Sequence, residues 1–218
     1  MLTPLQQRIA EIVSEAIVGT DIALAGGRAL IASGLVDRGT RDLDFFGSSS
    51  EVLVERLPVI TTALRGEGFD VEVRRSTETF ARIVVRGLGY ESEVDFGLDS
   101  RLFPIRQGEF APILSSKEVA VDKVLAIFGR AEARDLVDLA AIEQYFSMRD
   151  LFDLAREKDQ GIDLSVFADT ARRARHLHRA EFVVEDESYA ALMDTVDLWR
   201  ELALNIDRER GHGHGMER

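Results

Sequence analysis

Two aspartates stand at a spacing that places carboxylates side by side. Asp42 and Asp44 are separated by one residue and flanked by strand-forming apolar side chains. On a strand, such residues point to the same face, where their charges repel unless a cation lies between them. Mg²⁺ is a hard cation that prefers oxygen ligands, so the pair predicts a metal site that carries a nucleoside triphosphate.

A third carboxylate on a neighbouring strand would complete such a site. The segment YESEVDFGLD offers Glu91, Glu93 and Asp95 at alternating positions. Asp95 lies between Val94 and Phe96, the most apolar surroundings of the three, and is our choice. Two Mg²⁺ ions held by these carboxylates would activate an attacking hydroxyl and stabilise a leaving pyrophosphate.

A double glycine stands close before this pair. Gly26 and Gly27 follow a short apolar run and precede a helical segment. Glycines let backbone N–H groups approach a phosphate at a helix N-terminus. Alone, a Gly-Gly pair is usually a turn and a D-x-D pair is common in proteins. Their combination in a strand–turn–helix–loop–strand context favours a nucleotide site.

Hydrophobic periodicity predicts the elements that position these residues. In the first half, helices are expected over 3–19, from Gly27 to before Asp37, and over 51–64 with a kink or break at Pro58, and strands over 22–25, 43–46, 71–75, 80–85 and 91–96. From Ser116 the pattern becomes helical, with helices expected over 116–128, 131–146, 149–158, 164–178 and 188–208.

This change of period predicts the domain organisation and an α+β fold class. We expect a mixed β-sheet core with flanking helices over 1–112 and a helical lobe that completes the active site over 113–210. The segment 101–112 serves as the connector, and 211–218 forms a flexible tail.

Composition restricts the remaining possibilities. The 218 residues are 45% hydrophobic and carry a formal net charge of -12. That charge argues against non-specific binding to nucleic acid or anionic membranes, although a local basic surface remains possible. No cysteine is present, which excludes disulfides and thiolate metal sites. The N-terminus has no signal-peptide pattern and no apolar run could span a bilayer, so a cytoplasmic protein without a membrane partner is expected.

The segment ALAGGRALIASGLVDRGTRDLDFFG resembles the signature of the polymerase-β nucleotidyltransferase superfamily, and more closely its AbiEii/MenT branch of bacterial toxins. The matching positions are Gly26, Gly27, Ala29, Leu30, Arg38, Thr40, Asp42, Leu43, Asp44 and Phe45. The VDF sequence around Asp95 is similar to the strand that supplies the third acidic residue of the family.

A second segment, DKVLAIFGRAEARDLVDL, resembles the helical motif of that branch. The matching positions are Lys123, Ala126, Arg130, Arg134, Asp135 and Asp138. If one helix continues through Gly129, the spacing places Lys123, Arg130 and Arg134 on one cationic face. Without the first motif, the mixed charges would indicate a solvated, salt-bridged helix.

The resemblance implies Mg²⁺-dependent transfer of a nucleotide from an NTP to an acceptor hydroxyl. Asp42, Asp44 and Asp95 would hold the metals, and Asp95 would bind one metal or help to deprotonate the hydroxyl. Lys123 would bind phosphate oxygens and Asp138 would belong to the catalytic set. The other nucleotide-binding positions implied are Gly26, Gly27, Arg38, Thr40, Arg130, Arg134 and Asp135.

For the acceptor, MenT-like toxins imply the 3′ end of tRNA, which they extend with pyrimidine nucleotides and so block translation. AbiEii relatives are linked to GTP, which leaves the nucleotide open. Aminoglycoside or protein acceptors, and a non-catalytic nucleotide- or partner-binding module, are the alternatives. A cognate antitoxin is implied, and a kinase-like one would act on Thr40, where a phosphate would block nucleotide entry.

The densest basic run of the chain is ARRARHLHRAE, residues 171–181. Contact with the tRNA acceptor stem is one interpretation, and a solubilising face is the other. The arginines in question are Arg172, Arg173, Arg175 and Arg179.

Overall fold

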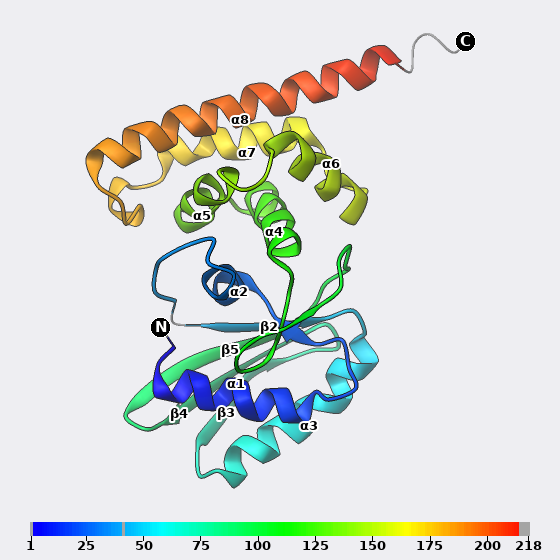
Figure 1. The fold of residues 1–218 in the computed structure, drawn as a ribbon, viewed down its shortest axis with the longest axis vertical. Coiled ribbons are helices and arrows are strands. Elements are labelled where there is room, and N and C mark those ends of the chain that lie inside the picture. The colour runs from blue at the N-terminus through cyan, green and yellow to red at the C-terminus, as the bar shows by residue number, and fades with distance from the viewer. Residues whose placement is uncertain (1, 41, 214–218) are drawn as a thin grey trace. The chain divides into compact units, whose positions relative to one another are not determined.

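The computed structural model describes residues 2–40 and 42–213, and the chain divides into two compact units, Met1–Val119 and Ala120–Arg218 (Figure 1). Each unit is described below by itself. Of the helices in these described ranges, none has the length and apolar character needed to cross a membrane.

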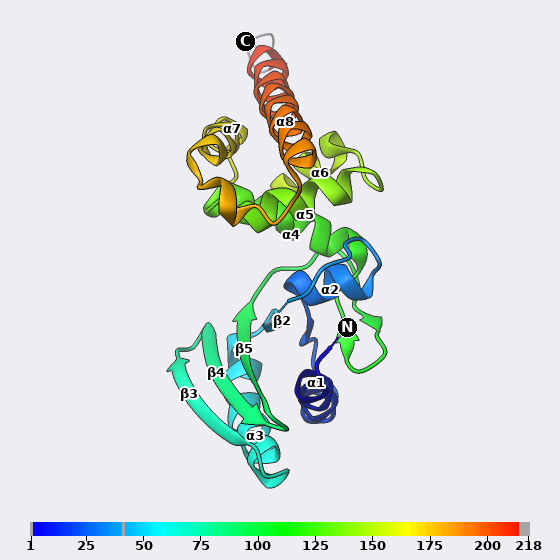
Figure 2. The same cartoon turned by 90° about the vertical axis from the view of Figure 1, so that its left-hand side faces the viewer.

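The first unit is built on a seven-stranded mixed sheet with the strand order β3-β4-β5-β2-β1-β7-β6. Strand β4 is antiparallel to its neighbours β3 and β5 (Figure 2). Strand β2 runs parallel to β5, and β1 runs parallel to β7. The strands are β1 (Ala23–Leu24), β2 (Leu43–Gly47), β3 (Asp70–Ser76), β4 (Phe80–Gly87), β5 (Tyr90–Leu98), β6 (Arg106–Gln107) and β7 (Pro112–Ile113).

Three helices accompany this sheet: α1 (Pro4–Ala16), α2 (Gly26–Ala32) and α3 (Ser50–Gly66). Helices α1 and α3 lie side by side and pack against one face of the sheet. Thr3 begins α1 with a capping box to Gln6, and Ser49 caps α3.

Side chains of β2 and β5 alternate between two environments, as expected for a sheet with one packed face. Phe45 and Phe96 stack in the core with ring centroids 5.7 Å apart, and both are fully buried. Asp44 and Asp95 are half-buried and point to the opposite face, which we call the outer face. The sheet therefore separates an apolar core from a face that carries carboxylates.

Three features of the first unit differ from the sequence-based expectation. Helix α2 ends at Ala32, although the sequence analysis expected it to continue to just before Asp37, and Gly34 follows with φ +70°. The connector 101–112 contributes the hairpin strands β6 and β7, which are too short to leave a periodic pattern. Helix α3 is not broken at Pro58, where a kink or break was predicted, and continues to Gly66.

The second unit is helical. Its elements are α4 (Ser116–Gly129), which begins in the first unit, then α5 (Ala133–Glu143), α6 (Met148–Lys158), α7 (Leu164–Arg172), the 3₁₀ turns η1 (Arg173–His176) and η2 (Arg179–Glu181), and α8 (Asp186–Gly213). Helices α5, α6 and α7 pack against α8. Trp199 of α8 is buried, and its indole N–H donates to Glu143 of α5 over 3.0 Å.

The helix predicted over 164–178 is wrong in its second half. Helix α7 ends at Arg172 and the chain continues in two short 3₁₀ turns, η1 and η2. Helix α8 continues to Gly213, which lies within the flexible tail predicted over 211–218. The rest of that predicted tail, 214–218, lies outside the described residues.

Candidate active site

Two of the predicted carboxylates are neighbours across the sheet. Asp44 of β2 and Asp95 of β5 are direct Cα partners in a parallel pair, so both project from the outer face at the spacing of adjacent strands. Asp42 stands two residues before Asp44 and is also half-buried. The fold therefore pairs Asp44 with Asp95, whereas Asp42 lies just before β2.

Arg82 occupies the next position in the same row and was missed by the sequence analysis. It is the Cα partner of Asp95 on β4. Its Nε and Nη2 atoms donate to the Oδ1 and Oδ2 atoms of Asp95, both over 2.7 Å. Such a two-pronged contact is the strong form of an arginine–carboxylate pair.

These hydrogen bonds raise the pKa of the Arg82 guanidinium above its ordinary value. Burial opposes the rise, and attraction to Glu93 and Asp42 adds to it. Asp42 thus lies within electrostatic reach of Arg82, although Asp42, Asp44 and Asp95 do not form one of the close acidic groups found among the described residues. The only sign of Arg82 in the sequence is a charged residue at an alternating position of the strand predicted over 80–85.

The double glycine lies against this carboxylate row. The N–H of Ala25 donates to the carbonyl of Asp44 over 2.8 Å, which brings the turn beside β2. Gly26 has φ +57°, and a Cβ there would stand 2.1 Å from Oδ2 of Asp44. A Cβ on Gly27 would stand 2.9 Å from Nη2 of Arg38. A side chain at position 26 would displace the Asp44 carboxylate and strain the backbone, whereas one at position 27 would displace only the flexible end of Arg38.

A buried arginine holds the loop that leads into Asp42. Arg28 donates from Nη2 to the carbonyl of Thr40 over 2.8 Å and to Oε1 of Gln6 over 2.6 Å. Burial, and after it repulsion from Arg38, lowers the pKa of Arg28. Sequence analysis did not single out Arg28. In the folded chain it fixes the backbone two residues before the first carboxylate.

In the second unit, Lys123 is enclosed by the two aspartates of its own motif. Its Nζ atom lies 2.8 Å from Oδ1 of Asp135 and 3.0 Å from Oδ2 of Asp138. Lys123 is 7% exposed and both aspartates are 0% exposed. Burial raises the pKa of Asp135, but Lys123 and Arg130 outweigh it and bring that pKa below its ordinary value. The three side chains form a buried ionic cluster.

The single cationic helix face considered for this motif does not form. Helix α4 ends at Gly129, and Ala131 has φ 48°, which separates α4 from α5. Arg130 donates from Nε to Oδ2 of Asp135 over 3.1 Å, and Arg134 pairs with Glu132 at 3.0 Å. The motif therefore joins two helices through ion pairs.

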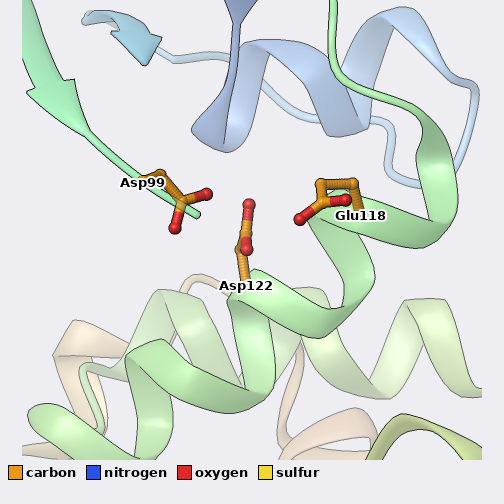
Figure 3. Close-up of side chains that lie close together, drawn as sticks. All are labelled: Asp99, Glu118 and Asp122. Atoms are coloured by element: carbon orange, nitrogen blue, oxygen red, sulfur yellow. The ribbon is translucent and has the colours of Figure 1, made fainter. Parts of the chain in front are cut away.

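A separate acidic group lies near the start of α4 (Figure 3). Carboxylate oxygens of Asp99 and Glu118 come within 4.8 Å of each other, and Asp122 follows Glu118 by one turn. Oε2 of Glu118 accepts the N–H groups of Leu102 and Phe103 at 3.0 and 2.8 Å.

Asp122 accepts a hydrogen bond from the ammonium of Lys158, whose side chain is buried. These bonds explain Glu118 and Asp122 as structural acceptors within the fold. Metal binding is therefore not needed to account for either carboxylate.

The basic run is largely neutralised by aspartates of its own unit. Oδ1 of Asp169 lies 3.6 Å from Arg172, Arg175 pairs with Asp197, and Arg179 pairs with Asp186 at 2.8 Å. Arg173 is exposed. Contact of this run with RNA stays a prediction, and the ion pairs reduce the charge that it presents.

Comparison of the chain with profiles of protein families shows the family to which it belongs. The profile of the family described as "Nucleotidyl transferase AbiEii toxin, Type IV TA system" matches residues 9–210. The chain belongs to the AbiEii nucleotidyltransferase toxin family. The resemblance predicted from the sequence is thereby confirmed. The predicted fold class is confirmed by the mixed sheet and helices described above and by the solved structures that follow. A search of curated proteins gives no match.

Solved structures with low sequence identity show the same fold. JHP933 from Helicobacter pylori is 18% identical with a TM-score of 0.59, over 99% of this chain and 98% of that one. MenT4, a nucleotidyltransferase toxin from Mycobacterium tuberculosis, is 18% identical with a TM-score of 0.59, over 90% and 82%. The antibiotic-resistance factor ANT(2″)-Ia is 12% identical with a TM-score of 0.52, over 81% and 100%.

The contact between Gly26 and Asp44 gives a testable prediction for this AbiEii-family chain. Gly26→Ala pushes its methyl group into the Asp44 carboxylate and displaces a predicted metal ligand. We expect Mn²⁺, used as a paramagnetic probe for Mg²⁺, to bind about 10- to 100-fold more weakly, as measured by electron paramagnetic resonance of the free ion.

The matched control for this prediction is Gly34→Ala. Gly34 has φ +70° and nothing within 4 Å of an added Cβ, so it shares the left-handed backbone without the collision. Each alanine destabilises the fold by about 1–2 kcal/mol through its positive φ. Equal Mn²⁺ affinity in the two variants would show that the Gly26 contact does not position a metal ligand.

The ionic cluster in the second unit gives a second prediction. Lys123→Met leaves the carboxylates of Asp135 and Asp138 buried without their shared cation. We expect the free energy of unfolding to fall by about 3–5 kcal/mol, measured by urea denaturation at neutral pH.

Arg134→Gln is the control, because it removes a half-exposed ion pair with Glu132 and changes stability by less than about 1 kcal/mol. Adding Asp135→Asn and Asp138→Asn to Lys123→Met should restore part of the loss. A Lys123→Met protein as stable as the parent would refute the cluster as a buried ion pair.

Proposed function

We propose that the chain is a Mg²⁺-dependent nucleotidyltransferase toxin that transfers a nucleotide, preferentially a pyrimidine nucleotide, to the 3′ end of tRNA. The proposal rests on one observation above all, the pairing of Asp44 with Asp95 beside the Gly26–Gly27 turn. Family membership supports the class of reaction and the toxin role.

The chemistry of the donors fits Mg²⁺. Asp42, Asp44 and Asp95 offer only carboxylate oxygens, and the glycine cradle leaves the Asp44 side chain room that a Cβ would fill. When bound, Mg²⁺ would neutralise charge on the phosphate oxygens during transfer. Asp42 and Asp44 are the proposed principal ligands, with Asp95 as the third.

The roles of the remaining residues follow from their places in the fold. The backbone of Gly26 and Gly27 would approach the phosphates, and the Arg38 guanidinium over Gly27 would attract them. Lys123 is the proposed triphosphate-binding group of the second unit. Its aspartates, Asp135 and Asp138, hold and orient the Lys123 ammonium. Arg130, which shares Asp135 with Lys123, and Arg134 are further candidates.

The proposed reaction exchanges one P–O bond for another. The terminal hydroxyl oxygen of the acceptor attacks the α-phosphorus, and the bond from that phosphorus to the pyrophosphate oxygen breaks. The hydroxyl proton leaves to a carboxylate, and this is the proposed alternative role of Asp95 if it does not bind a metal. Arg82 orients Asp95 through two hydrogen bonds, so one carboxylate position is fixed before substrate binds.

A toxin of this family requires control by an antitoxin, and the loop at Thr40 is the proposed point of control. Arg28 and Gln6 hold the Thr40 carbonyl, so the residue has a defined place two positions before Asp42. A phosphate there would add close to two negative charges beside the carboxylates and oppose entry of a triphosphate.

The modification is tested by co-expression with the neighbouring gene, followed by intact-mass measurement and peptide mapping. We expect one phosphoryl group on the peptide that contains Thr40, and none when Thr40→Val is expressed in the same way. An unmodified Thr40 peptide from inhibited toxin would discard this mode of control.

The acceptor and the site are tested together. The protein is incubated with total tRNA, Mg²⁺ and each labelled NTP in turn, and RNA, protein and small molecules are then separated. We expect label on tRNA, most from a pyrimidine triphosphate. Asp44→Asn should reduce it by about 100-fold or more, because an electrostatic contribution to the transition state is lost.

Glu55→Gln is the control for loss of a carboxylate away from the site, because Glu55 is exposed on α3, which packs on the other face of the sheet. If the label appears on protein or on an aminoglycoside and not on RNA, that molecule is the acceptor and the proposed tRNA acceptor is wrong. Equal labelling by Asp44→Asn would refute the site itself.

A further inference from the structure

An aromatic row lies directly beside the carboxylate row on the outer face. Gly97 of β5 is the Cα partner of Phe46 on β2 and of Phe80 on β4. Each of these residues is two positions along its strand from Asp44, Asp95 or Arg82, so both rows share one face. A Cβ on Gly97 would stand 3.0 Å from the Phe46 ring, so glycine leaves space for an aromatic ring there.

Phe80 is half-buried, and two guanidinium groups lie near its ring. The Cζ atom of Arg75 is 5.4 Å from its ring centroid, and that of Arg82 is 5.8 Å away. Arg82 is held by Asp95 at the same time. Phe80 is thus connected to the candidate active site through a single side chain.

Arg75 differs from the other arginines of this part of the sheet. Arg74 pairs with Glu72, and Arg86 pairs with Glu72 and Glu91. Arg75 is exposed on the edge strand β3, and within residues 2–40 and 42–213 it has no carboxylate partner. It keeps a full positive charge beside an aromatic ring.

The order of the strands gives the outer face a direction. The Gly26–Gly27 turn and Arg38 lie on the side of β1 and β2, Asp44 and Asp95 stand in the middle, and Phe80 and Arg75 lie on the side of β4 and β3. With the triphosphate on the glycine side, an attacking hydroxyl enters from the side of β4 and β3.

We propose that Phe80 and Arg75 dock the unpaired terminal nucleotide of an RNA acceptor next to Asp95. Phe80 supplies a ring against which a nucleobase stacks, and Arg75 binds its phosphate. A polycationic small molecule suits this surface poorly, because Arg75 and Arg82 repel it. The inference rests on the proposed function, since it assigns the acceptor surface of that same site.

The test compares Phe80→Leu with Phe80→Tyr, because leucine keeps apolar volume without a ring and tyrosine keeps the ring. We expect the Kd of a short single-stranded RNA ending in CCA, measured by fluorescence anisotropy without NTP, to rise about 5- to 100-fold in Phe80→Leu. In Phe80→Tyr it should stay near that of the parent. In the transfer reaction, the KM for tRNA rises in Phe80→Leu while the KM for NTP is unchanged.

Arg75→Gln tests the phosphate contact. Its binding should lose about 0.7 from the slope of log Kd against log salt concentration, the amount expected for one contact to a single strand. The matched controls are Arg74→Gln on the same strand and Tyr90→Leu at the exposed start of β5. Both should bind the RNA as the parent does, and thermal unfolding of every variant should match that of the parent.

Two negative results are distinguishable. If the parent protein labels tRNA but Phe80→Leu has unchanged Kd and KM for RNA, the docking surface is wrong and the proposed function stands. If the parent labels no RNA and binds none, both the proposed acceptor and the proposed docking surface are wrong.

Discussion

Repulsion between neighbouring carboxylates is the constraint on which the candidate site depends. Parallel pairing of β2 with β5 places Asp44 opposite Asp95, and the register of the two strands keeps these carboxylates next to each other. A slip of β2 by one residue would turn Asp44 toward the core, where a carboxylate without a partner is far more costly. Arg82 compensates the row from the next strand with two hydrogen bonds to Asp95. A divalent metal would extend the same compensation to Asp42 and Asp44.

In the second unit, repulsion between two buried carboxylates is likewise compensated by a cation. Asp135 and Asp138 lie one turn apart on α5 and would repel each other, but Lys123 from α4 lies between their oxygens. The cluster also explains the break between the helices. If α4 continued straight through Gly129, Asp135 would be carried three helical turns beyond Lys123, about 18 Å along the axis. Left-handed Ala131 turns the chain back instead.

The limits of the sequence analysis follow from the range of the interactions involved. Asp42, Asp44 and Asp95 could be proposed from the sequence because strand alternation is a local pattern and carboxylates at that spacing have few chemical roles. Arg82 and Arg28 were missed because their partners, Asp95 and the Thr40 carbonyl, lie 13 and 12 residues away, and only strand pairing and loop closure bring them together. The helix expected over 164–178 failed for a related reason, because arginines have good helix propensity and the 3₁₀ turns depend on contacts such as Arg175 with Asp197.

An acidic chain with an RNA acceptor is physically consistent when charge is considered locally. The net charge of -12 acts on encounter at long range, and salt screens it over about 8 Å under physiological conditions. Within that distance, the ion pairs that each arginine makes decide how much positive charge the surface presents to RNA. Most arginines of the sheet and of the 171–181 run already hold carboxylates, so they add little attraction. Arg75, whose guanidinium lies near the Phe80 ring and has no carboxylate partner among the described residues, keeps its charge next to the candidate site. Specific docking of one terminal nucleotide therefore requires only that local group, whereas non-specific binding along an RNA helix would require a positive surface that the paired arginines do not provide.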